Sequence, residues 1–461
     1  MYYRHETPFN ASQSVVFDYL LRPGIFERLC PPSEPIDIIA YPTRIDFEQP
    51  VCLRIHLFPG IGINWTLRHR DFVAGSHFFD EQVSGPFQSW QHRHAVEARG
   101  ESESVVIDEL DIHFPFSPAF FPLGEYLVGR VVKQKLGQLF AYRKVVMDLD
   151  LDQIQKGKPP MKILVTGATG LVGSALVPML SAQGHSVSKL VRRASSDKRW
   201  PEILWNPETG ELDKTQLEGF DAVVHLAGEN IASGYWTAAK KQKIRDSRVK
   251  GTQVLCETLA SLDKPPKVLV SASAIGFYGN RGDVILDEAS AQGDDFMAKV
   301  CREWEAACEP AKKTGIRVVN ARFGIILSPR GGALAKVLPI FKLAAGGNLS
   351  LLGKQYWSWI AIDDVVGGIA HVLQTETLSG PVNLVSPTAL TNASFTKTLA
   401  SVLKRPALFP APALALKLLL GEFADAVLLA STRVQPKALL DSGYTFQFPE
   451  LSTALKHLLG R

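Results

Sequence analysis

Two different spacings of apolar residues divide the chain. Up to about residue 150, short stretches alternate apolar and polar residues between turn-forming residues, which predicts antiparallel β-strands. The expected strands are IDIIAY, VCLRIHLF, INWTLRHRDF, HFFDEQV, SWQHRHAVEA and SVVIDELDIHF. A short helix capped by Asn10 or Ser12 precedes them. A longer helix over about 122–142 follows them, with an apolar stripe made of Leu123, Leu127, Val131, Leu136 and Phe140.

From Met161 onward, apolar strands alternate with helical patterns. The expected strands are KILVT, SVSKLV, DAVVHLAG, KVLVSAS and RVVNARFG, and the expected helices run through Leu180, over 237–262 and over 296–314. This alternation predicts an α/β fold, a Rossmann-type doubly wound parallel sheet with helices on both faces. The last part of the chain is mostly helical.

A polar stretch ending in two prolines separates the two patterns and has the composition of a linker. We therefore expect four parts. Residues 1–150 form an α+β helix-grip domain, in which strands are closed by a long helix, and residues 151–160 form the linker. The parallel α/β domain covers 161–403, and a small, mostly helical module covers 404–461.

Composition excludes several classes of protein. The 461 residues carry 50 Lys and Arg against 46 Asp and Glu, a net charge of +4, which gives no reason to expect nucleic acid or an anionic membrane as partner. The five cysteines form no CxxC pair, which favours a reducing cytosol over a disulfide framework. No signal peptide or spanning helix is recognisable. A soluble cytoplasmic protein is expected, with its oligomeric state open.

The segment TGATGLVG, residues 166–173, combines the first apolar strand of the α/β domain with three glycines and the start of a helix. Gly167, Gly170 and Gly173 permit a tight turn and let the backbone approach a pyrophosphate at the helix N-terminus. The expected cofactor contacts are Gly167, Thr169, Gly170, Leu171, Val172 and Gly173. The alternative is a tight turn that only packs.

The end of the second strand indicates which dinucleotide is bound. An acidic residue there would accept hydrogen bonds from the ribose 2′-hydroxyl of NAD. The chain has Arg192 and Arg193 instead, and two guanidiniums suit a 2′-phosphate. We therefore expect NADP(H), unless both arginines only solvate the edge of the sheet.

Further motifs resemble the extended, NAD-dependent epimerase/dehydratase branch of the short-chain dehydrogenase/reductase superfamily. They are GxxGxxG, DAVVHLAG at 221–228, SRVKGT at 247–252, SASAIGFYG at 271–279 and WSWIAIDD at 357–364. LAGENI and CREWEAAC resemble a sugar-nucleotide epimerase-like subgroup with a C-terminal module of unknown function. Its members are commonly fused to a START-like (polyketide cyclase-like, SRPBCC) domain, which residues 1–150 resemble in GPFQSWQHRHAVE and FAYRK. That resemblance implies an apolar ligand between the sheet and the long helix.

The resemblance also implies roles for individual residues. Cofactor contacts are expected from Leu226, Ala227, Gly228, Ser271 and Arg322, and substrate contacts from Glu229, Asn230 and Trp359. Chemistry in this superfamily uses a Ser together with a Tyr-x-x-x-Lys pair. Ser273 occupies the Ser position, and Lys299 falls near the Lys position, but its partner position holds Asp295. Tyr278 is the nearest phenol.

Two functions therefore remain open. In the first, the protein is an NADP(H)-dependent oxidoreductase or epimerase with a non-standard proton relay, in which Ser273 and Tyr278 serve a carbonyl oxygen. Asp295 could act as the base, although a carboxylate at the start of a helix is more often a cap. In the second, the protein binds NADPH as a sensor or scaffold and does not turn over. Hydride transfer distinguishes the two.

Two other features have plainer interpretations. His69, His92 and His94 lie in predicted strands, and His92 and His94 share a face, which suggests a metal pair. No nearby Cys or carboxylate in the sequence completes a set, so we expect histidines that pack on the sheet and assign no metal. Trp304 and Glu305 of CREWEAAC are expected to be a packing residue and a helix-surface charge.

Overall fold

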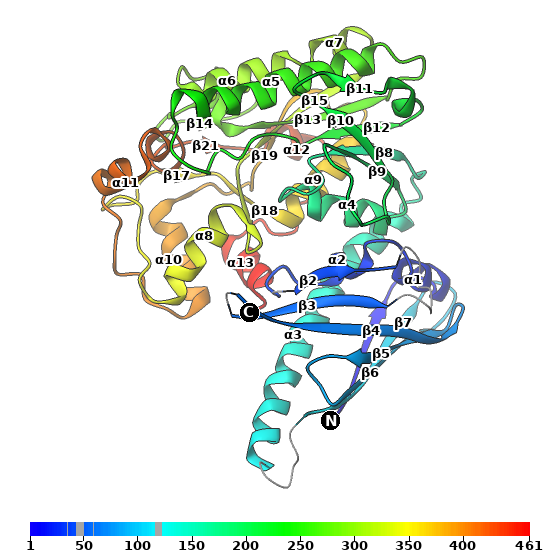
Figure 1. Ribbon diagram of the computed structural model, residues 1–461. Helices are drawn as coiled ribbons and strands as arrows, with labels where there is room; N and C mark the ends of the chain where they lie inside the picture. The colour runs from blue at the N-terminus through cyan, green and yellow to red at the C-terminus, as the bar shows by residue number, and fades with distance from the viewer. Residues whose placement is uncertain (35, 43–49, 59, 116–121) are drawn as a thin grey trace.

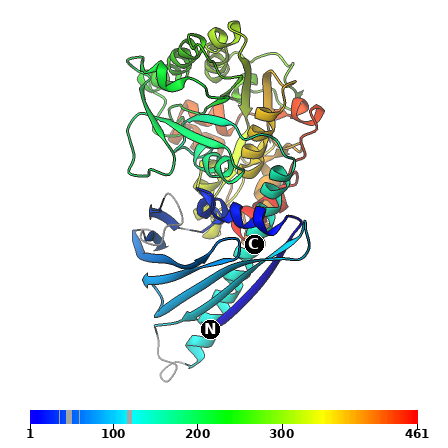
Figure 2. The same cartoon turned by 90° about the vertical axis from the view of Figure 1, so that its right-hand side faces the viewer.

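The computed structural model describes residues 1–34, 36–42, 50–58, 60–115 and 122–461. Two domains lie one above the other (Figure 1), one built on an antiparallel sheet and the other on a mostly parallel sheet. The short helices near the N-terminus lie between them (Figure 2). The expected order of an antiparallel α+β domain, a parallel α/β domain and a C-terminal helical region is confirmed.

The N-terminal domain contains a seven-stranded antiparallel sheet in the order β1-β7-β6-β5-β4-β3-β2. All six predicted strands are present. They are β2 (Ile36–Ala40), β3 (Val51–Phe58), β4 (Ile61–Val73), β5 (His77–Ser84), β6 (Ser89–Ala98) and β7 (Ser104–His113). A seventh strand, β1 (Tyr2–Phe9), was not predicted, and it pairs with β7 along its whole length. Polar residues such as His5 and Thr7 occupy its inward face and hide the apolar alternation.

Three helices complete this domain: α1 (Gln13–Leu20), α2 (Ile25–Leu29) and the long α3 (Pro122–Gln155). Leu136 and Phe140 of α3 are buried as expected, whereas Val131 is 60% exposed. The predicted positions Leu123 and Leu127 lie outside the described side chains.

The long helix α3 ends later than expected. Leu151 is buried and Ile154 packs against the same core, so the polar stretch after Asp150 still has an apolar helical face. The predicted linker 151–160 is therefore helical up to Gln155. Only residues 156–161 separate the helix from β8, the first strand of the next domain, which begins at Lys162.

The second domain contains an eight-stranded sheet in the order β11-β10-β9-β8-β12-β13-β15-β19, parallel except for β11. Its strands are β8 (Lys162–Thr166), β9 (Ser186–Val191), β10 (Glu202–Asn206), β11 (Glu211–Leu212), β12 (Ala222–His225), β13 (Val268–Ala274), β15 (Arg317–Phe323) and β19 (Gly380–Leu384). The strand order reverses between β8 and β12, and a doubly wound sheet binds its ligand at such a switch point.

The helices predicted through Leu180 and over 237–262 are present as α4 (Gly173–Ala182) and α5 (Ala238–Ala260). Two further helices, α8 (Gly332–Lys342) and α9 (Ile362–Gln374), were not predicted. The single helix predicted over 296–314 is two helices, α6 (Phe296–Ala306) and α7 (Glu309–Lys313). Pro310 lies in the first turn of α7, where it can begin a helix but could not continue one.

The C-terminal region shares its core with the parallel domain. Phe446, Phe448 and Leu455 are buried in the same apolar cluster as the strands β8 and β13. Its helices are α10 (Asn392–Leu403), α11 (Ala413–Leu420), α12 (Lys437–Asp441) and α13 (Leu451–Leu459). Three two-stranded sheets add to this part of the molecule. They pair β14 (Ile285–Leu286) with β21 (Arg433–Val434), β16 (Ile325–Ser328) with β18 (Trp359–Ala361), and β17 (Tyr356–Trp357) with β20 (Leu390–Thr391).

The two domains meet through a buried polar network. Asp150 at the end of α3 accepts hydrogen bonds from Arg28 and Tyr19 of its own domain, and from Gln183 beyond α4. Gly24, at φ +84°, lies so close to Pro178 of α4 that a Cβ atom would be 2.9 Å from its Cα. The domain interface is therefore close-packed at the helix that follows the glycine loop.

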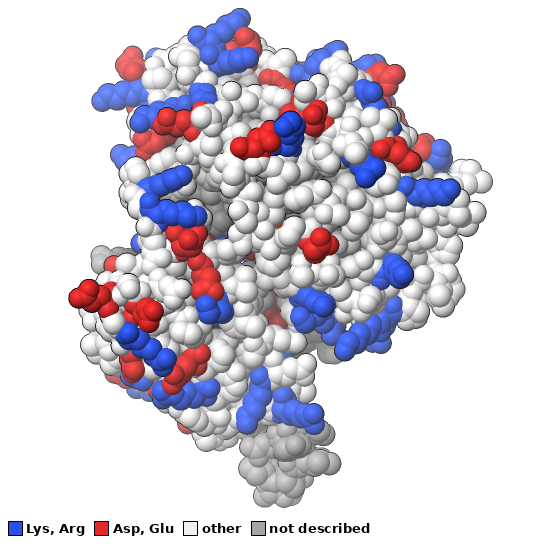
Figure 3. All heavy atoms as spheres, turned by 180° about the vertical axis from the view of Figure 1, so that it is seen from behind, with Lys and Arg blue, Asp and Glu red and all other residues white. Residues whose placement is uncertain are grey.

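Side chains of both charge signs lie on the face of the molecule shown in Figure 3. Figure 3 shows Lys and Arg interspersed with Asp and Glu, around a broad area that lacks charged side chains. Among the described residues, no helix has the length and apolar character needed to cross a membrane.

Candidate nucleotide site and its surroundings

The glycine loop follows β8 and leads into α4. Gly167 has φ +67°, and a Cβ there would lie 2.7 Å from the carbonyl carbon of Leu226. A Cβ on Gly173 would lie 2.3 Å from the Gly167 carbonyl oxygen. Both positions therefore require glycine, whereas Thr169 and Gly170 at the loop tip are exposed. The loop thus leaves its tip and the start of α4 open for a phosphate group.

Thr166 joins the ends of the two strands at the switch point. Its hydroxyl oxygen accepts hydrogen bonds from the backbone N–H groups of Leu226 and Ala227, each at 3.1 Å. The same hydroxyl lies 2.7 Å from Nδ1 of His225. Burial lowers the pKa of His225 to about 4, so the imidazole is neutral at pH 7. The segment 226–228 is thereby fixed beside the glycine loop, where the expected contacts Leu226, Ala227 and Gly228 lie.

Arg192 and Arg193 directly follow β9, the neighbour of β8 in the sheet. Both side chains are exposed, and neither guanidinium forms a hydrogen bond or ion pair with any described residue. Two unpaired cations at this strand end can accept a 2′-phosphate without first breaking an internal contact.

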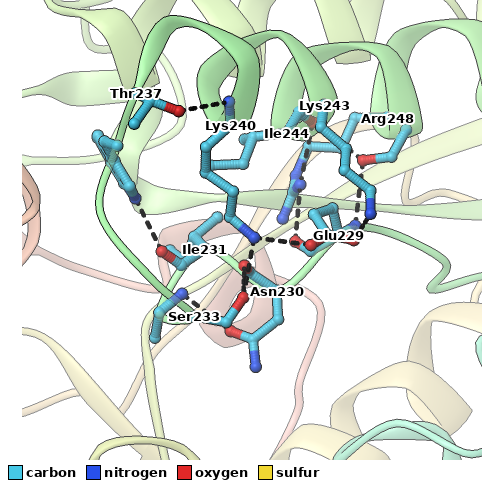
Figure 4. Close-up of polar contacts among 12 residues, drawn as sticks. Glu229, Asn230, Ile231, Ser233, Thr237, Lys240, Lys243, Ile244 and Arg248 are labelled. Atoms are coloured by element: carbon cyan, nitrogen blue, oxygen red, sulfur yellow. Dashed lines mark hydrogen bonds and ion pairs between the residues drawn. The ribbon is translucent and has the colours of Figure 1, made fainter.

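The loop after β12 carries the expected substrate residues Glu229 and Asn230 (Figure 4). Glu229 Oε1 accepts a 2.6 Å hydrogen bond from Lys240 of α5, and its backbone carbonyl accepts one from Arg248. The ion pair with Lys240 lowers the pKa of Glu229. Asn230 is exposed, and its side chain bonds only the backbone N–H of Ala232 among the described residues. Glu229 is thus fixed by α5, and the amide group of Asn230 retains donors for a ligand.

A buried polar network lies at the ends of β13 and β15. Ser273 donates a 2.6 Å hydrogen bond to Oε1 of Glu305, and Arg322 donates one bond to each oxygen of that carboxylate, both at 2.8 Å. Arg322 also donates to the Tyr278 hydroxyl at 3.0 Å, and Tyr278 donates to Asn383 at 2.8 Å. Two of the expected catalytic residues therefore belong to one network.

Glu305 of α6 is the residue that the sequence analysis missed in this network. Its side chain is 12% exposed and forms the ion pair with Arg322, so the expectation of a helix-surface charge is wrong. Trp304 beside it is a packing residue as expected, and its indole N–H donates to Thr252. The amphipathic pattern of α6 does reveal an inner face, but the pattern alone does not show that Arg322 lies opposite Glu305.

Of the residues expected to act in catalysis, Tyr278 belongs to this network, whereas Asp295 and Lys299 lie outside it. Tyr278 has no exposed surface, and burial raises the pKa of its phenol. Asp295 caps α6 by accepting a 2.8 Å bond from the backbone N–H of Ala298. Lys299, one turn later, is exposed. The structure thus joins Ser273 to Tyr278 through Arg322 and Glu305, and gives Asp295 the capping contact that was its plainer interpretation.

Three further expected contacts are buried in this structure. Ser271 lies in the middle of β13, and Arg322 is occupied by Glu305 and Tyr278. Trp359 has no exposed surface, and its indole N–H donates to the Thr388 carbonyl at 3.0 Å. These side chains lie beneath the open strand ends rather than at their surface.

The strand histidines of the N-terminal domain are accompanied by carboxylates. In the sheet register, His92 of β6 is opposite Asp80 of β5, and His94 is opposite Asp108 of β7. The expectation that no carboxylate completes a set is therefore wrong, because the missing residues come from neighbouring strands. Burial lowers the pKa of His92 to about 4. Burial would also lower that of His94, but Asp80 and Asp108 outweigh it and raise the pKa to about 9.

Comparison with known proteins places this architecture in a family. Residues 163–384 match the NAD dependent epimerase/dehydratase family, and residues 411–458 match a domain of unknown function, DUF1731. An "Epimerase family protein" of Mycobacterium bovis is 42% identical over 299 residues, which cover 65% of this chain and 98% of that protein. The chain belongs to the epimerase family.

Solved structures of epimerase-family proteins extend the comparison. The human epimerase family protein SDR39U1 (isoform 2), crystallised with NADPH, is 33% identical and covers 65% of this chain and 99% of its own, with a TM-score of 0.61. The nucleoside-diphosphate sugar epimerase from Corynebacterium glutamicum is 31% identical, with a TM-score of 0.78 over 100% of this chain and 90% of its own. The second comparison includes the N-terminal antiparallel domain.

Proposed function

We propose that this epimerase-family protein binds NADP(H) at the switch point between β8 and β12. The observation that carries the proposal is the glycine loop, at which Gly167 and Gly173 permit no side chain and the start of α4 stays open. The free guanidiniums of Arg192 and Arg193 favour the 2′-phosphate of NADP(H). The similar human protein was crystallised with NADPH, which supports the same cofactor here.

We further propose that the protein is an oxidoreductase or epimerase that acts on a carbonyl or sugar-nucleotide-like substrate. The bound cofactor would donate the hydride as NADPH in carbonyl reduction and would take it up as NADP⁺ in alcohol oxidation. In the direction of alcohol oxidation, Ser273 Oγ accepts the proton of the substrate hydroxyl while its own proton passes to Glu305. In the reverse direction the protons return along the same route. Arg322 and Tyr278 position the Glu305 carboxylate, and Glu229 and Asn230 contact the substrate. Trp359 is fully buried, so in this structure it supports the substrate side from within the core.

One observation favours the second candidate, an NADPH-binding sensor or scaffold without turnover. Tyr278 is fully buried, and its hydroxyl donates a hydrogen bond to Asn383. It is therefore not the reactive phenol that short-chain dehydrogenase/reductase chemistry ordinarily uses. In this candidate the Ser273–Glu305 pair only holds β13 and α6 together.

The N-terminal domain supports a ligand role in either case. Its seven-stranded antiparallel sheet and the long helix α3 line a largely apolar cavity of about 400 Å³, which supports the START-like character proposed for this domain. We propose that this cavity holds an apolar ligand.

Stereospecific deuterium transfer tests the proposed chemistry. Full-length protein is incubated with NADPH deuterated at either face of C4 and a panel of carbonyl compounds, and the product is analysed by mass spectrometry. We expect transfer from one face, reduced about 10²-fold or more in Ser273→Ala and unchanged in Ser188→Ala, a strand serine of β9. Binding of NADPH without transfer to any compound would favour the sensor. Equal transfer by both variants would refute the role of Ser273.

A further inference from the structure

Five of the polar side chains that line the N-terminal cavity form one cluster on the sheet. They come from four adjacent strands: His69 from β4, Asp80 from β5, His92 and His94 from β6, and Asp108 from β7. Asp108, His92 and His94 are each at least 91% buried. Charged groups at such depth need compensating charges and hydrogen bonds.

The contacts among these residues follow a definite pattern. Asp108 Oδ1 lies 2.8 Å from Nε2 of His92 and 3.0 Å from Nδ1 of His94. One carboxylate therefore orients both imidazole rings, and each ring keeps a second nitrogen. Nε2 of His94 lies 3.0 Å from Oδ2 of Asp80, whose other oxygen contacts Nδ1 of His69 at 2.5 Å.

Asp80, His92 and His94 each offer one ligand atom, and these atoms lie within 4.8 Å of one another. Zn²⁺ binds nitrogen and oxygen ligands at about 2.0–2.2 Å, which places neighbouring ligand atoms about 3–4 Å apart. Small side-chain rotations therefore suffice to close the three residues around one ion. Metal-bound histidines usually donate their other N–H to a carboxylate, which is the position that Asp108 occupies towards both rings.

The geometry points to a mononuclear site for a divalent transition-metal ion on Asp80, His92 and His94, with Asp108 and His69 as its outer partners. Two imidazoles and one carboxylate suit Zn²⁺, Fe²⁺ or Co²⁺ better than Ca²⁺ or Mg²⁺. All three residues line the cavity. A fourth coordination position therefore faces it and can take an oxygen atom of a bound apolar molecule. This site is independent of the nucleotide site.

Cobalt binding tests the site in the full-length protein. Chelator-treated protein is titrated with CoCl₂ while the visible d–d absorption is recorded, and Zn²⁺ is then added as a competitor. We expect one Co²⁺ per chain, displaced by one Zn²⁺, without the intense sulfur charge-transfer band that any of the five cysteines would give. Asp80→Asn and His94→Gln should lose at least 90% of the d–d signal. His77→Gln, a histidine of β5 outside the cluster, should retain it.

Near-UV circular dichroism and NADPH affinity check that each variant is folded. If both ligand variants unfold, X-ray absorption at the cobalt edge of the wild-type protein decides, because two imidazoles and no sulfur are expected. A wild-type protein that gives no stoichiometric cobalt signal would overturn the proposal. A signal that persists in folded Asp80→Asn and His94→Gln, or a sulfur-bound cobalt, would also overturn it.

Discussion

Replacing Glu305 by Gln removes one charge from a buried ion pair with almost no change in side-chain size. In the wild-type protein Arg322 is 4% exposed in its side chain, and both of its bonds to the carboxylate are 2.8 Å long. Removing one partner of a buried pair costs about 3–5 kcal/mol, because the remaining charge stays desolvated without compensation. Gln keeps one acceptor oxygen but turns an N–H₂ group towards Arg322. We therefore expect a loss of about 3 kcal/mol in the free energy of unfolding.

Urea denaturation of the full chain, followed by tryptophan fluorescence, measures this loss as a lower midpoint at an unchanged slope. Glu303→Gln is the matched control, since Glu303 lies on the same helix but pairs at the surface with Arg245, which is 46% exposed in its side chain. The control should change the free energy of unfolding by less than about 1 kcal/mol. Equal midpoints for the two variants would refute the conclusion that Glu305 balances a buried charge.

Three further predictions concern the nucleotide site and the C-terminal region. In calorimetric titration, the double variant Arg192→Ala, Arg193→Ala should bind NADPH about 10–100-fold more weakly and NADH as tightly as the wild type does. An equal loss of affinity for NADPH and NADH would show that the arginines do not contact the 2′-phosphate. Gly173→Ala should lower NADPH affinity at least about 100-fold, because the added Cβ would lie 2.3 Å from a backbone oxygen. Gly137→Ala is the control, since its Cβ would meet no atom within 4 Å, and it should leave the affinity unchanged. Retained affinity in Gly173→Ala would contradict the close packing of the loop. Burial raises the pKa of Asp364 from 3.8 to about 6, so the stability associated with its protonated form is present below pH 3.8 and lost as the pH rises through 6. Asp364→Asn should therefore gain in melting temperature relative to wild type over that range, and a constant difference would show that Asp364 does not titrate there.

The features that the sequence predicted correctly depend on short stretches of chain. The glycine loop could be located because strand, turn and helix follow one another directly within residues 162–182. The same holds for six strands of the N-terminal sheet, whose alternation reflects one buried and one exposed face. The strand β1 was not predicted because its inward residues include His5 and Thr7, so its two faces differ little in polarity.

The partners within the buried polar networks could not be predicted in the same way. Glu305 faces Arg322 only because α6 packs beside β13 and β15, and nothing in the helix pattern identifies that neighbour. Asp80 and Asp108 join His92 and His94 through the register of three neighbouring strands, which depends on how the strands pair and cannot be read from any one of them alone. Such contacts need the fold before they can be recognised.

Calorimetric titration of the full-length protein with NADPH, and separately with NADH, tests the central claim most directly. The account predicts one NADPH bound per chain and an affinity for NADPH at least about 10-fold higher than for NADH, because only NADPH carries the phosphate that the two arginines can bind. Binding of neither nucleotide, or tighter binding of NADH, would contradict it.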